Sequence, residues 1–453
     1  MAEAATTQVR DSGIAAHRAG RLDEALRHYA DHLERTPEDA GIWSNLGVVL
    51  RQKQLHDQAL RAQERAIALD PKAEGIRSNY ANILSDIGRY DESIAMRRSV
   101  LVDRPDDAMH KAMIGRCLRG KGAYAEAIAY LQTAMAAHPD DAELRIQLAF
   151  AQLGAGDHAA GFANYRARWQ GGELTPRKLP WPEWQGGDAA GKTLLVLPEQ
   201  GFGDAVLFAR YLPRLKALGA RVLFHVDRPL QRLFSALPGV DRTGSLSRPD
   251  EPVDGWVNLM DLPLADLQPG PAIPPPATLH VPEEARQRAR RIVAPYREKF
   301  RIGVVWTGSV TYKGNVFRSF SHREFLPLTD LPGVQLFSVY KGPELGPYRV
   351  DGSKAFILDT ASTDRDFADC AATMQEMDLI ITSDTATAHI AGTLGLPTWV
   401  VLHWDPFWVY THAGETTPWY PTMRLFRQQR PRDWSAPFNA ILAELQALLE
   451  ARG

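Results

Sequence analysis

The chain has 453 residues, and its 52 lysines and arginines nearly balance 54 aspartates and glutamates, giving a formal net charge of −2. This balance argues against a dedicated nucleic-acid-binding protein, which usually carries a strong basic excess. Hydrophobic residues are 45% of the chain, which excludes wholesale disorder. We expect no transmembrane segment, since no apolar run approaches roughly 18 residues. We also expect no signal peptide, since the first residues, MAEAATTQVRDSG, have no positive head followed by an apolar stretch. Two cysteines are too few for a disulfide framework, which favours a cytoplasmic protein.

The first third of the sequence repeats itself every 34 residues. Prolines and small residues mark the period: Pro37, Pro71, Pro105 and Pro139; Gly47, Ala81 and Gly115; Ala25, Ala59, Ser93 and Ala127; Gly20, Gly88, Gly122 and Gly156. Small residues allow two helices to approach closely, glycine marks the turn between them, and proline ends each pair.

A helix–turn–helix period of this length is typical of tetratricopeptide repeats. The sequence resembles that family over residues 6–170, with four clear units and a fifth that decays at 161–169. We therefore expect an all-α solenoid over 1–170, whose concave groove holds a protein partner or substrate. The alternative is that the repeats only hold homo-oligomers together.

The pattern changes to α/β after Trp169. Residues 192–226 indicate a strand, a glycine-rich loop, a helix and a second strand, and the proline-rich stretch 269–276 indicates a hinge. Further strands are expected at 301–308, 334–340, 378–384 and 397–404, with helices at 385–395 and 436–451. The sequence thus predicts two doubly wound domains, 171–285 and 286–453, with ligands between them at the carboxyl ends of the strands.

Three segments, 199–213, 366–401 and 418–428, resemble the bacterial heptosyltransferase-like glycosyltransferases, and more closely the subgroup with N-terminal tetratricopeptide repeats, which includes flagellin glycosyltransferases. The resemblance implies a GT-B fold of two Rossmann-like domains. It also implies an inverting, metal-independent enzyme without a cofactor, which takes its sugar from a nucleotide-sugar co-substrate. Relatives often carry an arginine where Phe407 stands here. The donor contact that this arginine makes is therefore not expected in this chain, and we do not infer the donor sugar from the relatives.

The first glycine-rich loop holds the expected catalytic base. Inverting transfer needs a carboxylate to deprotonate the acceptor hydroxyl, and Asp204 follows a Gly-x-Gly turn and aligns with the family's catalytic aspartate. The alternative is that Asp204 caps the next helix. Glu199 is a reserve base, and Gln200 either orients a substrate hydroxyl or ties down the loop. Gly201 and Gly203 allow the backbone to approach substrate closely.

The second half is expected to hold the nucleotide-sugar. A strand-to-helix junction at 383–389 offers the amides of Thr385, Ala386 and Thr387 to phosphate, with Asp384 positioning the loop or a sugar hydroxyl. His389 is either a ligand-binding or a packing residue. The remaining donor-side candidates are Trp306, Gly308, Lys313, Asn315, Arg318, Tyr340 and Lys341.

Among these candidates, Lys313 and Arg318 are phosphate cations or belong to a solvated loop. Tyr340 either stacks on the nucleotide base or packs at a strand end, and tryptophans 404, 408 and 419 either line the cleft or pack in the core. Asp364 and Asp366 form a D-x-D pattern that we interpret as capping or a turn, not as a metal site.

The leading hypothesis is a protein O-glycosyltransferase that acts on Ser or Thr hydroxyls of an acceptor bound by the repeats, with flagellin an acceptor by family analogy. Two alternatives stay open. One is transfer to a lipid-linked saccharide, against which the repeats and the lack of a basic amphipathic anchor argue. The other is a non-catalytic scaffold with a retired transferase fold.

Overall fold

The computed structural model describes residues 2–171, 174–246, 249–265 and 273–452. The chain forms two compact units, Met1–Ala155 and Gly156–Gly453. Each is described by itself. The expected hinge at 269–276 lies partly outside the described residues, and its described part, 273–276, is neither helix nor strand.

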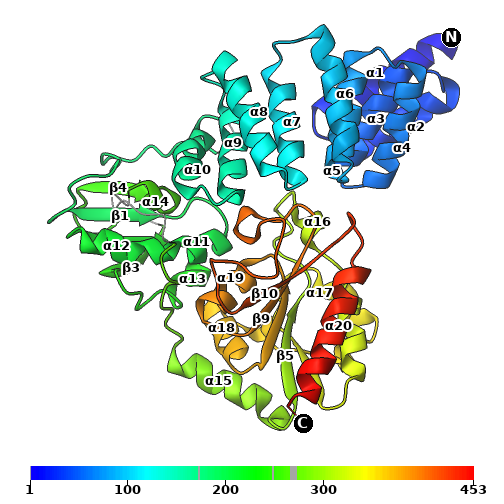
Figure 1. Cartoon of the computed structure of the whole chain (residues 1–453). Coiled ribbons are helices and arrows are strands. Elements are labelled where there is room, and N and C mark those ends of the chain that lie inside the picture. The colour runs from blue at the N-terminus through cyan, green and yellow to red at the C-terminus, as the bar shows by residue number, and fades with distance from the viewer. Residues whose placement is uncertain (1, 172–173, 247–248, 266–272, 453) are drawn as a thin grey trace. The chain divides into compact units, whose positions relative to one another are not determined.

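The first unit is entirely helical over its described residues (Figure 1). Its helices are α1 (Ala2–Arg18), α2 (Leu22–Arg35), α3 (Ala40–Gln52), α4 (His56–Leu69), α5 (Glu74–Asp86), α6 (Tyr90–Asp103), α7 (Ala108–Gly120), α8 (Tyr124–Ala137) and α9 (Ala142–Gly154). Consecutive helices pack against each other, and α7 also packs against α9. This is the stack of helix pairs that the 34-residue period predicts.

Sequence period and backbone geometry agree at the turns. Gly20, Gly88 and Gly122 turn with positive φ angles of 73°, 80° and 74°. In the one repeat that lacks glycine at this position, Gln54 adopts φ 61°. A left-handed conformation is uncommon for a residue with a side chain, so the turn itself, and not the glycine, is what the stack requires.

Small residues set how closely the helices of a pair approach. A Cβ added at Gly47 would lie 2.5 Å from Nε2 of Gln63, and one added at Gly115 would lie 2.4 Å from Cδ2 of Leu131. Both partners lie sixteen positions further along the chain, so each repeat makes the same contact with a different side chain.

The second unit contains two fully parallel sheets. The four-stranded sheet has the order β3-β2-β1-β4 and the six-stranded sheet has the order β10-β9-β8-β5-β6-β7. Their strands are β1 (Thr193–Leu197), β2 (Arg221–Val226), β3 (Arg242–Ser245), β4 (Gly255–Asn258), β5 (Phe300–Val305), β6 (Val334–Ser338), β7 (Ile357–Asp359), β8 (Leu379–Ser383), β9 (Thr398–Leu402) and β10 (Met423–Arg427).

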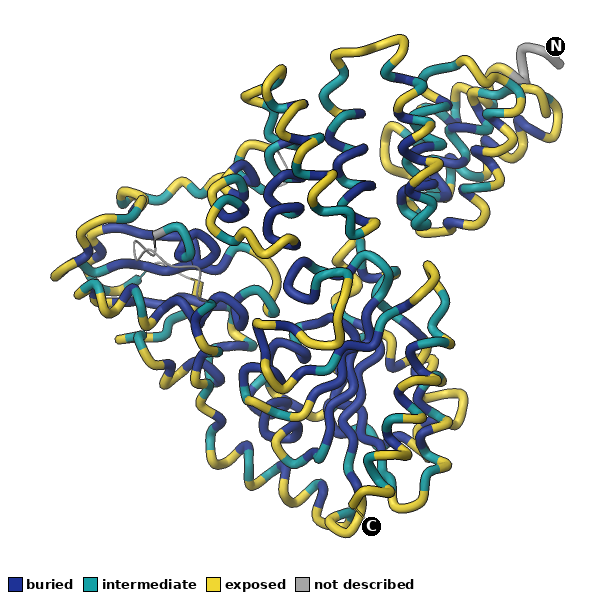
Figure 2. Tube along the Cα trace, viewed as in Figure 1, coloured by how far each residue is buried: buried dark blue, intermediate teal, exposed yellow. Residues whose placement is uncertain are grey.

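Helices cover both faces of the six-stranded sheet, with α17 and α20 on one side and α18 and α19 on the other (Figure 1). The helices of this unit are α10 (His158–Tyr165), α11 (Phe202–Phe208), α12 (Leu212–Ala217), α13 (Arg228–Gln231), α14 (Leu262–Ala265), α15 (Glu283–Val293), α16 (Asn315–Arg318), α17 (Leu345–Val350), α18 (Phe367–Gln375), α19 (Ala386–Thr393) and α20 (Ser435–Glu450). Short 3₁₀ helices connect several of them. The strands are the most buried part of the unit (Figure 2).

The strand orders fix where a ligand can bind. In the larger sheet the chain runs outward from β5 to β6 and β7 on one side, and to β8, β9 and β10 on the other. In the smaller sheet β1 lies between β2 and β4. Ligands of open parallel sheets bind outside the carboxyl ends of the strands where the order reverses. The loops after β1, β5 and β8 occupy these positions.

The predicted strands that begin near residues 193, 301, 334, 378 and 397 are confirmed as β1, β5, β6, β8 and β9. Strands β3, β4, β7 and β10 were not predicted. β3 and β7 are short, with sequences RTGS and ILD. The second helix of the fifth repeat, α10, belongs to the sheet unit and packs against α14.

Candidate functional site

Three helices of the sheet unit begin close together. The rings of Phe202, at the start of α11, and Phe367, at the start of α18, lie 5.2 Å apart. A Cβ added at Gly203 of α11 would lie 2.8 Å from Cδ2 of His389 and 3.5 Å from the Cα of Ala386, both in α19. Gly203 therefore permits the first turns of α11 and α19 to touch, and brings the β1 loop to the β8 loop.

Asp204 occupies the third position of α11, with Gly201 as the N-cap residue. Its Oδ2 accepts a hydrogen bond from the Gly201 amide at 3.0 Å. The capping interaction that the sequence left open is thus present, and it holds one carboxylate oxygen in place. A capping role and a catalytic role are compatible, because the bond fixes the orientation of the carboxylate.

The surroundings of Asp204 make its carboxylate a stronger base than usual. Burial raises its pKa to about 6, and the charge of Asp384 adds to this rise, while the Gly201 amide and Arg318 oppose it. A carboxylate with a pKa near 6 is mostly ionised at neutral pH and accepts a proton more readily than an ordinary aspartate. Like charge and burial together are the usual means of tuning a base.

The N-terminus of α19 has no side-chain cap. Thr385 is its N-cap residue, and its side chain makes no capping hydrogen bond. In the first turn the Ala388 amide donates to the main-chain oxygen of Thr385 at 3.0 Å. The amides of Ala386 and Thr387 are those that a helix end leaves without a partner in the helix, and the helix dipole adds partial positive charge there. This end of α19 therefore has the chemistry to bind an anion.

Arg318 lies beside that helix end. A Cβ added at Gly308 would lie 2.7 Å from Nη2 of Arg318 and 3.0 Å from Cγ2 of Thr385. The guanidinium lies over the Tyr312 ring, 4.7 Å from its centroid. Within the part of the chain that the structure describes, Arg318 forms no ion pair at 4 Å or less, although its charge acts on Asp204 and Asp384.

Asn315 holds this arrangement together and does not face solvent. Its Oδ1 accepts from the Gly308 amide at 3.1 Å and from Nε of Arg318 at 3.2 Å, and its Nδ2 donates to Oγ1 of Thr307 at 2.9 Å. Gly308 leaves room for Arg318 because it has no side chain. These two residues shape the site around the cation.

His389 is a packed, neutral residue. Its Nδ1 lies 3.0 Å from the Tyr420 hydroxyl, and only 4% of the residue is exposed. Burial lowers its pKa to about 3, and the charges of Arg210 and Arg318 lower it further. The ring forms the surface on which Gly203 rests, which agrees with the packing alternative.

The remaining donor-side candidates divide into exposed and buried residues. Lys313 is exposed, and the Lys341 ammonium donates to the main-chain oxygen of Asp364. Trp306 and Tyr340 are buried, with ring centroids 5.2 Å apart. Tyr340 thus packs against Trp306 at the strand end in this structure.

The loop before Asp204 is tied to residues 165–168, which follow the first unit in the chain. Nε2 of Gln200 donates to the Tyr165 hydroxyl at 2.7 Å, and Nη2 of Arg168 pairs with Oε1 of Glu199 at 2.6 Å. Burial raises the pKa of Glu199 to about 7, although Arg168 opposes this. The sequence missed Tyr165 and Arg168. Their only signal is that 161–169 departs from the repeat pattern through large aromatic and basic residues.

The tryptophans near the site are mostly part of the core. Trp408 and Trp419 are buried and lie 5.1 Å apart, and α10 packs on them through Phe162, 5.9 Å from Trp408. Trp404 is half-buried with its ring edge-on to Phe317 at 5.7 Å. The ring centroids of Phe407 and Trp408 lie 5.1 Å apart.

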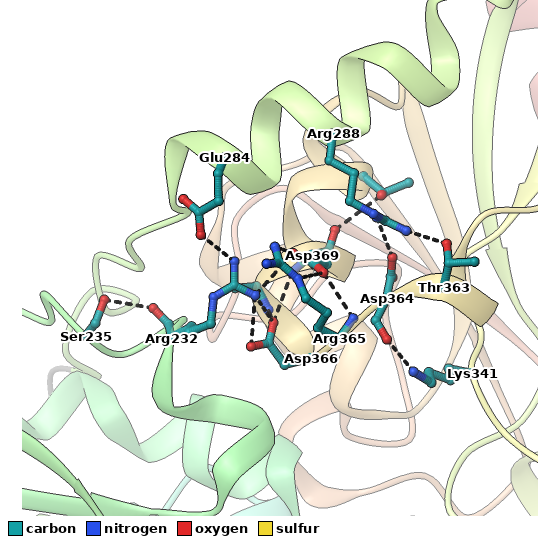
Figure 3. A network of polar contacts seen from close by, with 12 residues as sticks. Arg232, Ser235, Glu284, Arg288, Lys341, Thr363, Asp364, Arg365, Asp366 and Asp369 are labelled. Atoms are coloured by element: carbon teal, nitrogen blue, oxygen red, sulfur yellow. Dashed lines mark hydrogen bonds and ion pairs between the residues drawn. The ribbon is translucent and has the colours of Figure 1, made fainter.

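A dense ion-pair network surrounds the D-x-D pattern (Figure 3). Asp366 caps α18 by accepting from the amides of Ala368 and Asp369, and it pairs with Arg232 at 2.9 Å. Asp364 is buried and pairs with Arg288 at 2.7 Å. These carboxylates are occupied by cations of the chain, which agrees with the capping interpretation. Among the described residues, no cluster of three or more His, Cys, Asp or Glu side chains has metal-binding geometry.

Comparison with known proteins identifies the first unit. Family models described as "Tetratricopeptide repeat" match residues 10–74 and 118–161. The N-terminal part of the chain is a tetratricopeptide-repeat array. These repeats are a protein-interaction scaffold, and they indicate that the chain has protein partners. No helix among the described residues is both long enough and apolar enough to span a membrane.

One curated relative covers more than the repeats. The chain is 27% identical over 301 residues to "Protein FlbA" of Caulobacter vibrioides (strain ATCC 19089 / CIP 103742 / CB 15). The match covers 59% of this chain and 49% of that protein, so the chain spans about half the length of this relative.

Solved structures of the protein MamA resemble part of the chain. The "MamA 41-end from Desulfovibrio magneticus RS-1" structure is 18% identical with a TM-score of 0.34, and it covers 37% of this chain and 94% of that one. A "Crystal structure of MamA protein" is 17% identical with a TM-score of 0.33, and it covers 39% of this chain and 98% of that one. Scores this low carry no argument about function.

Proposed function

We propose that the sheet unit is an inverting, metal-independent glycosyltransferase of the GT-B type, which moves a sugar from a nucleotide-sugar to Ser or Thr hydroxyls of a protein. One observation carries the proposal: the Asp204 carboxylate, the uncapped N-terminus of α19 and the Arg318 guanidinium lie together where the strand orders of two parallel sheets reverse. A base and an anion-binding group are the two elements that this reaction needs.

The proposed step is a single displacement. Asp204 takes the proton of the acceptor hydroxyl, and the hydroxyl oxygen forms a bond to the anomeric carbon of the sugar. The bond between that carbon and the phosphate oxygen breaks, and the nucleotide leaves as an anion. The α19 amides and Arg318 stabilise its developing negative charge.

The repeats supply the second part of the proposal. A repeat array offers an extended binding surface, and its presence in the same chain supports a protein as the acceptor rather than a lipid-linked saccharide. Flagellin is one acceptor to test, and a cytoplasmic location is part of the same proposal.

Intact-mass analysis tests the proposal directly. Candidate acceptors, flagellin included, are incubated with the protein and a panel of activated sugars, with and without EDTA. We expect a discrete mass increment with one sugar, unchanged by EDTA. If no sugar is transferred and calorimetry detects no binding of nucleotides or nucleotide-sugars, the scaffold role of the repeats is the function that remains.

The matched variant is Asp204→Asn. Asparagine has the same shape, and its oxygen still accepts from the Gly201 amide, but it does not take up a proton. We expect transfer to fall about 10²–10⁴-fold, the usual contribution of a general base, with nucleotide binding retained. Normal turnover by this variant would remove Asp204 from the mechanism.

A further inference from the structure

The four residues that connect β1 to α11 are each held by a side chain. They form no helix or strand, and they run directly into the helix that carries Asp204. Arg177 bonds to Pro198, and Arg168 bonds to Glu199. Tyr165 bonds to Gln200, and Asp204 bonds to Gly201. Three of the four partners come from residues 165–177, which lie between the first unit and β1.

Arg168 makes the strongest of these contacts. Its Nη2 donates to Oε1 of Glu199 at 2.6 Å and to Oδ1 of Asp261 at 2.8 Å, and the exposed fractions of the three side chains are 4%, 1% and 9%. Asp261 follows β4, and its Oδ2 accepts from Nδ2 of Asn258 at 3.1 Å. One buried guanidinium thus ties together the ends of β1 and β4, the two strands between which the sheet order reverses.

Tyr165 makes the contact closest to Asp204. It is the last residue of α10, and its hydroxyl accepts from Gln200 at 2.7 Å. Burial raises the pKa of Tyr165, and the Asp204 charge adds to the rise, so the two groups are near enough to interact. Asp204, Gln200 and the Tyr165 hydroxyl therefore form one polar group.

The departure of 161–169 from the repeat pattern has a structural explanation. Tyr165 stands four full periods after Tyr29, which only packs inside the first repeat and lies 3.2 Å from Nδ1 of His17 through its hydroxyl. At the same position of the fifth repeat, the tyrosine hydroxyl contacts the loop before Asp204. Arg168 is buried, and a buried arginine requires partners such as Glu199 and Asp261.

We propose that α10 and the following 3₁₀ helix, Arg166–Trp169, form a clamp that positions the Asp204 loop, with Tyr165 and Arg168 as positioning residues. Its kinetic consequence rests on the proposed function. A loop without secondary structure holds a base precisely only through such contacts, and a misplacement of about 1 Å can cost 10²-fold in rate.

The first test compares Tyr165→Phe with Tyr29→Phe. Both changes remove one hydroxyl at the same repeat position, and only the first frees Gln200. Amide hydrogen exchange is measured over 198–204 in both variants. We expect about tenfold faster exchange in Tyr165→Phe, the factor that one lost hydrogen bond corresponds to, and no change in Tyr29→Phe. Equal exchange in the two variants overturns the clamp.

The second test replaces Arg168 by Met and by Lys. A lysine ammonium is able to pair with both Glu199 and Asp261 from one nitrogen, as Nη2 of the arginine does, whereas methionine leaves two buried carboxylates together. We expect Arg168→Met to lower kcat about 100-fold with the donor KM changed less than about threefold, and Arg168→Lys to recover most of the rate. Arg424→Met, which breaks a surface pair with Glu444, is the control for lost ion pairing.

The two tests separate the clamp from the proposed function. Hydrogen exchange does not depend on activity, so it tests the clamp even if the wild-type protein transfers no sugar. If the wild type is active and Arg168→Met keeps its kcat, the clamp is wrong and the glycosyltransferase proposal stands. A loss of kcat that Arg168→Lys does not recover, with the fold intact by thermal unfolding, also contradicts the positioning role.

Discussion

Helices α18 and α19 flank the same strand, β8, and both begin against α11, yet their N-termini differ. Asp366 fills the end of α18, where it accepts from two amides and pairs with Arg232. Thr385 leaves the end of α19 without a side-chain cap, and Arg318 adds a second source of positive charge beside it.

This difference shows that helix geometry alone does not make a binding site. Each helix end carries the same unpaired amides and the same dipole. An end occupied by a carboxylate of the chain is already neutralised and serves stability. An end without one, next to a cation that has no carboxylate within ion-pair distance in the described chain, is the end at which we propose that the anionic ligand binds.

Among changes at these two helix ends, removing the Arg318 cation beside α19 should have the largest effect on nucleotide binding. We expect Arg318→Gln to weaken the binding of nucleoside diphosphates about 10- to 100-fold in calorimetry, since a charge-assisted hydrogen bond contributes about 1.5–3 kcal/mol. Arg349→Gln removes an exposed cation on α17 and is the control. Equal affinities for the two variants would place the phosphate elsewhere.

Adding a carboxylate cap to α19 should have the next largest effect on nucleotide binding. Thr385→Asp gives α19 the same N-cap residue type that α18 has, and the new carboxylate competes with phosphate for the helix amides. We expect nucleotide affinity to fall about tenfold, which is 1.4 kcal/mol. Thr385→Ser adds no charge and should bind as the wild type does. Unchanged binding by Thr385→Asp argues against the α19 site.

Asp384, which lies next to the N-cap of α19, should influence how the transfer rate depends on pH. Transfer requires ionised Asp204, so the rate should rise with pH through about 6. Burial raises this pKa, and the Asp384 charge raises it further, so Asp384→Asn should move the acid limb of the profile to lower pH. Asp364→Asn removes a buried carboxylate that faces Arg288 and should leave the limb in place. A limb that does not move in Asp384→Asn contradicts the assignment of the base.

Removing the cap of α18 should have the smallest effect of these changes, and we expect it on thermal stability. Asp366→Ala loses the α18 cap, at about 1 kcal/mol, and also leaves Arg232 without one of its carboxylates. Asp141→Ala loses only the cap of α9, where Asp141 accepts from the Leu144 amide at 2.8 Å. We expect thermal unfolding of Asp366→Ala to begin at lower temperature than that of Asp141→Ala. The reverse order would mean that the Arg232 network adds nothing.

Local patterns predicted much of the architecture. Recurring glycine, alanine and proline predicted the helix pairs because each residue acts within its own repeat, at a turn or at a contact sixteen positions away. Uninterrupted apolar runs predicted the central strands because those strands are buried on both faces. Short edge strands such as β7 gave no comparable signal.

The site was predictable only in part. Asp204 and the 383–389 junction were predicted because each lies where a strand is followed by a helix in the sequence, and Asp204 also through the family resemblance. Arg318 was predicted as a cation, but its place beside Thr385 depends on two loops that are far apart in the chain. Trp306 and Tyr340 were both predicted as donor-side candidates, whereas the fold buries their rings against each other.

The sequence by itself determined the repeat array, the parallel strands and the residue types available for chemistry, because these follow from periodicity and from short-range turns. Only the tertiary structure decided which groups meet. It set Gly203 against His389, Arg318 beside Thr385, and Tyr165 and Arg168 on the loop before Asp204. The physical reason is that hydrogen bonds and ion pairs form between atoms close in space, and the order in which a sheet winds brings such atoms together.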